Sequence, residues 1–97
     1  MNPYDKIADE LEQHPEQWTR GEFARNAKGE SVHPCDLAAV SWCAGGLCIR
    51  DGCSSAILDV ILWAKRKVRT EQYNDARGRR VEHIIKLFRA AAKWWAA

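Results

Sequence analysis

Apolar side chains recur at helical spacing in four segments of the chain. The clearest segment covers residues 79–95, where apolar positions return every three or four residues and the charged residues fall largely between them. Residues 56–64 are apolar nearly all round, which predicts the central core helix, capped by Ser54 or Ser55. Two more helices are expected from Pro3 to His14-Pro15 and from Asp36 to about Arg50.

A different pattern separates the first two of these helices. Residues 22–25 and 30–33 flank Asn26-Ala27-Lys28-Gly29, which is typical of a type I turn followed by a left-handed glycine. We therefore predict a short β-hairpin, with Phe23 and Val32 on its inner face and Trp18 anchoring it to the helices.

These elements predict a mainly α fold. We expect one small four-helix domain over residues 1–97, with a short β-hairpin between the first and second helices. Residues 65–69 extend the third helix in this interpretation, and residues 70–78 form a connecting loop. Asp59, the one polar residue of the third helix before Lys65, is expected near a helix end or at the rim of the core.

Adjacent glycines interrupt the second predicted helix at Gly45-Gly46. They cost a helix roughly 1–2 kcal/mol relative to alanine, so helix propensity does not account for them. Close approach of another backbone would offset this cost. The alternative is that the glycines break the helix and form a loop near a ligand.

Charge is divided sharply along the sequence. Residues 1–64 hold 5 Lys/Arg against 10 Asp/Glu, whereas residues 65–97 hold 10 against 3, within a net charge of only +2. The C-terminal third is therefore expected to meet an acidic surface. We define a basic patch by seven of its residues: Lys65, Arg66, Lys67, Arg69, Arg77, Arg79 and Arg80.

Three kinds of partner have an acidic surface that would suit this patch: a larger protein, a nucleic acid, and a copy of the chain's own N-terminal half. Helices on either side of Asp51-Gly52-Cys53 mimic a helix-turn-helix, but the second helix is apolar where base-reading side chains are needed. Nucleic acid would thus be bound through phosphates, with low sequence selectivity. An acidic protein surface is the preferred partner.

Catalytic and metal chemistry have weaker signals. The four cysteines have looser spacing than the usual C-x2-C pairs of zinc sites, so we expect reduced thiols that fill small spaces, with no metal and no cofactor. A thiol centre at His33-Pro34-Cys35 or at Cys43, with His14 or His83 as a base, is the enzymatic alternative. No P-loop, G-x-S-x-G or H-E-x-x-H motif supports it, and we expect a protein that is not an enzyme.

Two further pairs of residues, Asn74-Asp75 and Trp94-Trp95, each allow two interpretations. Asn74 and Asp75 precede the last helix and are expected to cap its N-terminus, or else to form a site. One of Trp94 and Trp95 can close the core, while the other points elsewhere and can join a homodimer. With neither a secretory signal nor a membrane-spanning stretch in the sequence, we expect a cytoplasmic protein with no membrane partner.

Short landmarks occur in a definite order along the chain: Trp18-x-x-Gly21-x-Phe23-Ala24-Arg25, Gly29, Trp42-Cys43-Ala44-x-Gly46 and Tyr73-Asn74-Asp75. This order resembles a family of small bacterial and phage proteins of unknown function, over roughly residues 7–92. Leu47-Cys48 and Arg80 depart from the pattern expected of that family, and among the cysteines only Cys43 falls on a landmark.

The resemblance implies a compact helical domain without assigned activity, an origin in a phage or other mobile element, and no catalytic residue. We accordingly expect a small protein-binding regulator or inhibitor, of which a phage-encoded inhibitor of a host complex such as a CRISPR effector is one specific form. The alternative is a nucleic-acid-binding protein that contacts phosphates.

Overall fold

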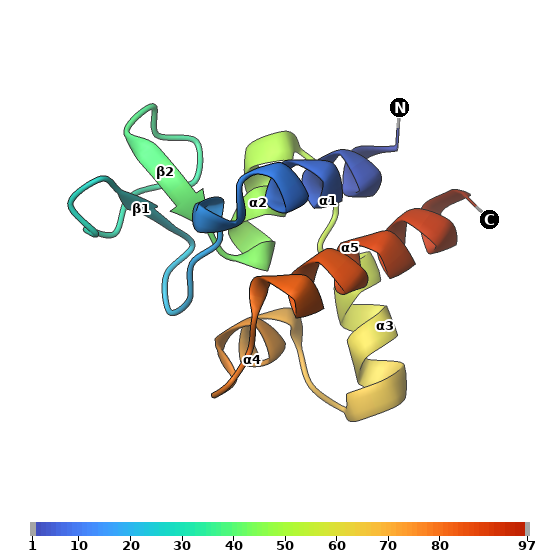
Figure 1. Ribbon diagram of the computed structural model, residues 1–97. Helices are drawn as coiled ribbons and strands as arrows, with labels where there is room; N and C mark the ends of the chain where they lie inside the picture. Colours follow the sequence, from blue (N-terminus) through green and yellow to red (C-terminus); the bar gives the residue numbers. More distant parts are fainter. Residues whose placement is uncertain (1, 97) are drawn as a thin grey trace.

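A computed structural model of the protein describes residues 2–96. Over this range the chain forms five α-helices, one 3₁₀-helix and a pair of antiparallel strands (Figure 1). Their bounds are α1 Pro3–Gln13, η1 Pro15–Gln17, β1 Ala24–Asn26, β2 Ala39–Trp42, α2 Ala44–Asp51, α3 Ala56–Arg66, α4 Thr70–Asp75 and α5 Val81–Ala96. The predicted mainly α fold, with a short β element between the first and second helices, is confirmed.

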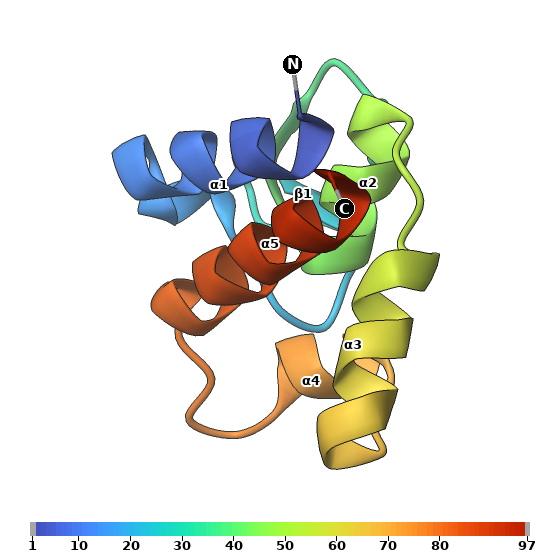
Figure 2. The ribbon, with the colours of Figure 1, turned by 90° about the vertical axis from the view of Figure 1, so that its right-hand side faces the viewer.

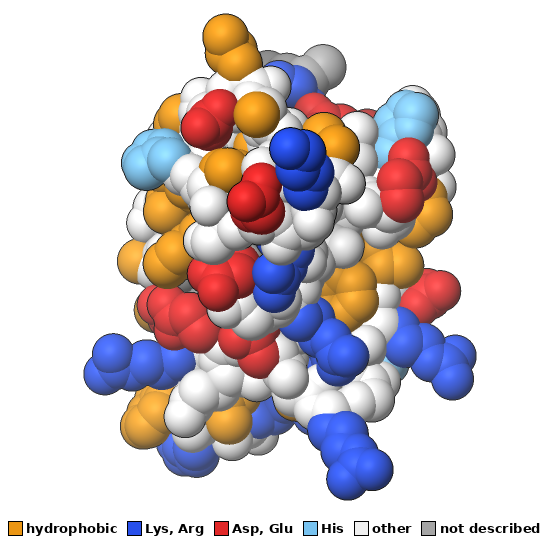
Figure 3. Space-filling view, turned by 90° about the vertical axis from the view of Figure 1, so that its left-hand side faces the viewer, with side chains coloured by type: hydrophobic (Ala, Val, Ile, Leu, Met, Phe, Trp, Pro, Cys, Tyr) orange, Lys and Arg blue, Asp and Glu red, His pale blue; other side chains and the backbone are white. Residues whose placement is uncertain are grey.

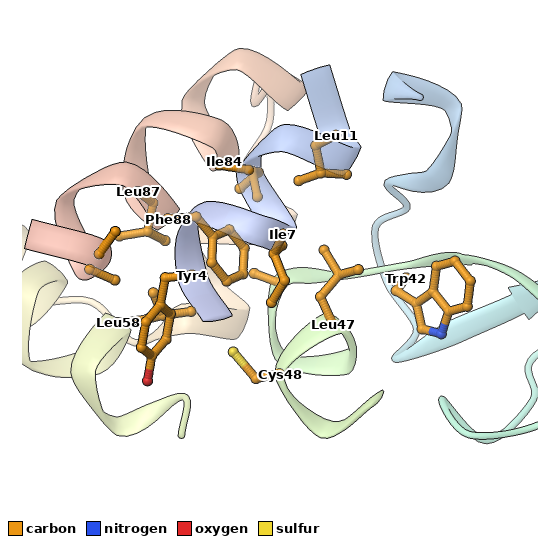
Figure 4. Packing of buried hydrophobic residues seen from close by; sticks show 14 of the residues in the cluster. Tyr4, Ile7, Leu11, Trp42, Leu47, Cys48, Leu58, Ile84, Leu87 and Phe88 are labelled. Carbon is orange, nitrogen blue, oxygen red and sulfur yellow. The ribbon is translucent and has the colours of Figure 1, made fainter. Parts of the chain in front are cut away.

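The core centres on the two terminal helices, which lie side by side (Figure 2). Tyr4 and Ile7 of α1 meet Phe88 of α5, and the rings of Tyr4 and Phe88 stack with their centroids 6.4 Å apart (Figure 4). Asn2 joins the two helices at one end, because its Oδ1 accepts the Tyr4 N–H at 3.0 Å while its Nδ2 donates to the Ala92 carbonyl. The periodicity of residues 79–95 thus predicted an amphipathic helix correctly, although the face that α5 buries also includes Leu87 and Ala91.

The expectation that the third helix lies at the centre of the core is wrong. In α3 only Leu58 and Leu62 are buried, whereas Val60 and Trp63 are about half exposed. Figure 2 shows α3 at the edge of the domain, beside α5. A helix in this position buries one side only, so its remaining apolar residues face outward.

The third helix also ends earlier than predicted. Lys67 has φ of 57° and caps α3 in the left-handed conformation, so residues 67–69 leave the helix. At the other end, the Ser54 hydroxyl oxygen accepts the Ala56 N–H at 3.1 Å, in agreement with the predicted start.

The chain then enters α4, where we predicted a loop. Asp59 of α3 stabilises the start of this helix, because its Oδ1 accepts both the backbone N–H and the hydroxyl of Thr70. Gln72 Oε1 accepts the N–H of Arg69, which satisfies another donor at the same helix start. Asp59 therefore lies at the rim, as expected, where it stabilises the next helix.

The strand pairing differs from the predicted hairpin. β1 pairs with β2, in the register Ala24↔Trp42 and Arg25↔Ser41, and residues 30–33 contribute a single bridge, Arg25↔Ser31. The turn at residues 26–29 forms as predicted, with Gly29 at φ of 82°. Phe23, expected on the inner face, is about half exposed and lies outside the core, while Val32 is half-buried against it.

The second helix is shorter than predicted because residues 39–42 are used in β2. Asp36, expected as its N-cap, instead accepts the Ala38 N–H at 2.8 Å in the turn before that strand. The helix begins at Ala44, after Cys43. Across residues 2–96, no helix is long and apolar enough to cross a membrane.

The predicted backbone approach at the paired glycines is confirmed. A Cβ placed on Gly46 would collide with the Phe23 carbonyl oxygen and lie 2.9 Å from the carbonyl carbon. The same carbonyl accepts the Cys43 N–H at 3.2 Å. The start of α2 is thus pressed against the backbone that leads into β1, which requires a residue without a side chain at Gly46.

Candidate functional site

Asn74 is the polar centre of the fold. It is fully buried in α4, where its Oδ1 accepts the Trp18 Nε1–H at 2.7 Å and the Ala44 N–H at 3.0 Å. Its Nδ2 donates to the Thr19 carbonyl at 3.1 Å and to Asp75 Oδ1 at 2.9 Å. These are the four hydrogen bonds that a side-chain amide can form, so Asn74 has no hydrogen-bonding capacity left for a ligand.

The predicted role of Asn74 and Asp75 as caps of the last helix is wrong. Ala44 is the first residue of α2, so Asn74 caps α2. Asp75 accepts the Gly21 N–H at 3.0 Å and thereby holds the loop before β1. The start of α5 uses a different partner, since His83 Nδ1 accepts the N–H of Arg80.

The landmarks of the sequence gather around this centre. Trp18 and Trp42 form a bridge between their backbones, Gly21 bonds to Asp75, and Gly46 lies against Phe23. The interactions of these residues are with one another, across segments far apart in the sequence. Their geometry assigns them to the framework of the fold.

A small hollow of about 140 Å³ opens beside this framework. Its lining residues are Gly21, Glu22, Phe23, Cys43, Glu71 and Asp75. Cys43 is buried and its Sγ accepts the Gly46 N–H at 3.3 Å. Burial raises the pKa of Cys43, which keeps the thiol protonated and fits the predicted packing role.

The four cysteines are free thiols. Cys48 is buried and shares a hydrogen bond with half-buried Cys53, which raises the pKa of Cys48 and lowers that of Cys53. Among residues 2–96, no group of three or more His, Cys, Asp or Glu side chains is arranged to hold a metal ion. His33 Nδ1 accepts the Cys35 N–H at 3.0 Å, which gives that ring a local structural contact.

We expect alkylation to separate these thiols by their burial. In the folded protein, Cys43 and Cys48 should react at least about a hundredfold more slowly than exposed Cys35, because their labelling requires local opening of the core. Alkylation followed by peptide mass spectrometry measures the four rates, and labelling in denaturant gives the reference. Rapid labelling of Cys43 in the folded protein would contradict the packing role and favour a reactive thiol.

The structure brings the two halves of the basic patch together on Tyr73. The Arg79 guanidinium lies 3.6 Å from the centroid of this ring, and that of Arg66 lies 5.4 Å from it. Arg79 Nε also donates to the Tyr73 carbonyl at 2.7 Å. The end of α3 and the segment before α5 are therefore one structured surface.

Figure 3 shows Lys and Arg side chains projecting from the lower end of the molecule, where Figure 1 places the end of α3, α4 and the start of α5. None of the seven patch residues forms an ion pair with a carboxylate between residues 2 and 96. Six of them are exposed, and Arg79 is half-buried.

The acidic residues of α1, by contrast, have basic partners within the molecule. Arg89 of α5 pairs with Asp5 at 2.9 Å, with Asp9 at 2.7 Å and with Glu12. Arg50 pairs with Glu10 at 2.8 Å. The hydrogen bonds that Arg89 donates to Glu12, Asp9 and Asp5 raise the pKa of its guanidinium. Each of these four carboxylates thus contacts an arginine of the same molecule, whereas the basic patch has no carboxylate partner among residues 2–96.

Trp94 and Trp95 both lie on the surface, each about half exposed. The expectation that one of them closes the core is wrong, because Ala91 and Ala92 complete the buried face at this end of α5. Self-association through these indoles stays a prediction.

Comparison with known proteins identifies a family. The model of a family of unknown function, DUF6197, matches residues 4–93, which is almost the whole chain. No curated protein and no solved structure matches the chain. The chain therefore belongs to the DUF6197 family.

Proposed function

We propose that this domain acts by binding another protein, and that the basic patch docks on an acidic surface of a larger partner. The observation that carries the proposal is the contrast in ion pairing: Arg89 and Arg50 form ion pairs with carboxylates of α1, whereas the seven patch residues pair with no carboxylate among the described residues. Unpaired like charges held close together repel one another, and an acidic partner would relieve that repulsion.

The alternative partner is a nucleic acid, bound through its phosphates with little sequence selectivity. Two exposed apolar residues next to the patch favour a protein instead. Val60 and Trp63 of α3 lie beside its first residues, and protein interfaces combine such an apolar centre with a polar rim. A phosphate backbone would leave these side chains without a partner.

A domain of this kind needs no chemistry of its own. It would serve as a regulator or inhibitor by occupying a surface of its target. A phage-encoded inhibitor of a host assembly such as a CRISPR effector would have this form.

Affinity capture from a lysate of the source organism tests the proposal. The double variant Arg77→Glu/Arg80→Glu reverses charge in the patch, and Lys6→Glu/Lys28→Glu makes the same change of charge at exposed positions outside it. We expect the wild type and the Lys6/Lys28 variant to retain a common protein partner that the patch variant loses, with or without nuclease treatment. Equal retention by the patch variant would contradict the proposal, and loss after nuclease would favour nucleic acid.

A further inference from the structure

The outer side of α3 presents an apolar face where the sequence led us to expect a buried helix. Val60 and Trp63 are 51 % and 52 % exposed, and Ala64 follows on the same face one turn after Val60. Trp94 of α5, which is 54 % exposed, extends this surface across to the neighbouring helix. Large apolar side chains at this spacing are typical of a surface that a partner covers.

This face is grooved. One hollow of about 550 Å³ is lined by Asp59, Val60, Trp63, Ala64 and Arg69. A second hollow of about 310 Å³ is lined by Val60, Ile61, Ala64, Lys65, Ala90 and Trp94. The two share Val60 and Ala64, so they adjoin along this row of α3 and together form a continuous, mostly apolar depression that reaches α5. We call it the α3 groove.

The charges at the edge of the α3 groove are basic. Arg69 lines one hollow and Lys65 lines the other, and Arg66 and Lys67 follow at the same end of the helix. Among residues 2–96, the one carboxylate that lines the groove is that of Asp59, and it already accepts two hydrogen bonds from Thr70. The groove therefore has an apolar floor and a cationic edge, and the basic patch continues directly from that edge.

We infer that the α3 groove binds an acidic amphipathic helix of the partner protein. This inference rests on the proposed function and names the element that the partner contributes. The apolar face of such a helix would cover Val60, Trp63 and Trp94, while its glutamates and aspartates would meet Lys65 and Arg69. Charge complementarity selects an acidic helix over a neutral or basic one.

The same charges disfavour a second copy of this chain as the occupant. A two-fold dimer through the groove would bring Lys65 and Arg69 of one copy toward those of the other, which is unfavourable. A head-to-tail dimer would need the acidic face of α1, and Arg89 already pairs with Asp5 and Asp9 there.

A synthetic peptide provides the probe for a test. It has about 15 residues, enough for four helical turns, with leucine at i, i+3, i+4 and i+7 and glutamate at most other positions. A scrambled peptide of the same composition keeps the charge but loses the apolar face. Titrations followed by amide chemical shifts of the labelled protein compare the wild type with Val60→Ser/Trp63→Ala, with Arg77→Glu/Arg80→Glu, and with Leu37→Ser, which removes an exposed apolar side chain before β2.

We expect the amphipathic peptide to bind and to shift amides of α3 and the C-terminal half of α5. Val60→Ser/Trp63→Ala should weaken binding at least about tenfold, and Leu37→Ser should leave it unchanged. Both altered side chains of the groove variant are half exposed, and an unchanged amide spectrum outside α3 checks that the fold is retained.

Other results would overturn the inference in distinguishable ways. Equal binding of both peptides, lost only in the Arg77/Arg80 variant, would reject the groove and leave the proposed function standing. Binding of neither peptide would reject the groove, and the capture experiment would then decide the proposed function separately. A single-stranded oligonucleotide that binds with the same dependence on Trp63 would replace the protein partner by nucleic acid. Dimerisation in light scattering that is lost in the groove variant would make a second copy the occupant.

Discussion

Replacing Gly46 by alanine is expected to lower the free energy of unfolding by about 3 kcal/mol, at the upper end of the usual cost of overpacking. The added methyl group would collide with the Phe23 carbonyl, which is backbone and cannot move aside by changing a rotamer. Either α2 or the segment before β1 must shift, and a shift would weaken the hydrogen bond from the Cys43 N–H to the same carbonyl. Urea unfolding followed by tryptophan fluorescence measures the loss.

Gly45 offers a matched control in the same turn of α2. A Cβ there would lie 3.4 Å from Phe23 Cε1, the end of an exposed side chain that can rotate away. Alanine at this position should therefore be neutral or should stabilise the helix by up to about 1 kcal/mol. Similar stabilities for the two alanine variants would contradict the close approach of the two backbones.

Replacing Asn74 by alanine is expected to lower the free energy of unfolding by about 3 kcal/mol, because several buried hydrogen-bonding groups would lose Asn74, their common partner, at the same time. The Trp18 indole N–H and the Ala44 N–H would lose their acceptor, and the Thr19 carbonyl would lose a donor. The loss should be larger than the roughly 1 kcal/mol of an ordinary exposed helix cap. Chemical unfolding gives the value directly.

Glu71→Ala supplies the control for Asn74, since Glu71 is exposed on the same short helix. Its effect should stay within about 0.5 kcal/mol. A change of similar size for Asn74→Ala would show that the four hydrogen bonds do not hold the fold. Unchanged folding with lost partner binding would return Asn74 to the role of a binding residue.

Features that depend on local sequence, such as a strong amphipathic pattern, could be predicted directly. Residues 79–95 have the periodicity of a helix with one buried face, and α5 follows it closely. Gly45 and Gly46 were unfavourable for a helix unless a backbone came close, and the Phe23 carbonyl meets that condition at Gly46. In both cases local sequence and tertiary packing favour the same structure.

The strands were harder to predict because pairing is not local. Residues 39–42 combine small and apolar side chains, and a short run of this kind fits a strand or a helix equally well. Their partner, β1, lies before a loop of more than ten residues, so nothing near residues 39–42 specifies the pairing. The turn at residues 26–29 has a local signature, and it was predicted correctly.

The candidate site shows the same limit. Counting charges was enough to locate the basic patch, whereas the ion pairs of Arg89 with Asp5 and Asp9 join opposite ends of the chain. Asn74 likewise caps a helix that begins thirty residues earlier. Its position before the last helix suggested a cap there, because a sequence shows which residues are neighbours along the chain but not which residues are close in space.

Among the wrong predictions, the expected burial of the third helix is the most informative. A segment that is apolar nearly all round is normally buried, yet Val60 and Trp63 face outward at the edge of the domain. This departure from the local rule lies next to the unpaired cations of the basic patch. Places where a sequence contradicts its local environment are those where function is expected.

Zero-length crosslinking of the captured complex tests the central claim most directly. Carbodiimide joins a lysine to a carboxylate that already contacts it, and the chain has lysines both inside and outside the patch. We predict links from Lys65 and Lys67 to Asp or Glu residues of the partner, identified by mass spectrometry. Links confined to Lys6 and Lys28, with none from the patch, would contradict the claim that this surface docks on an acidic protein.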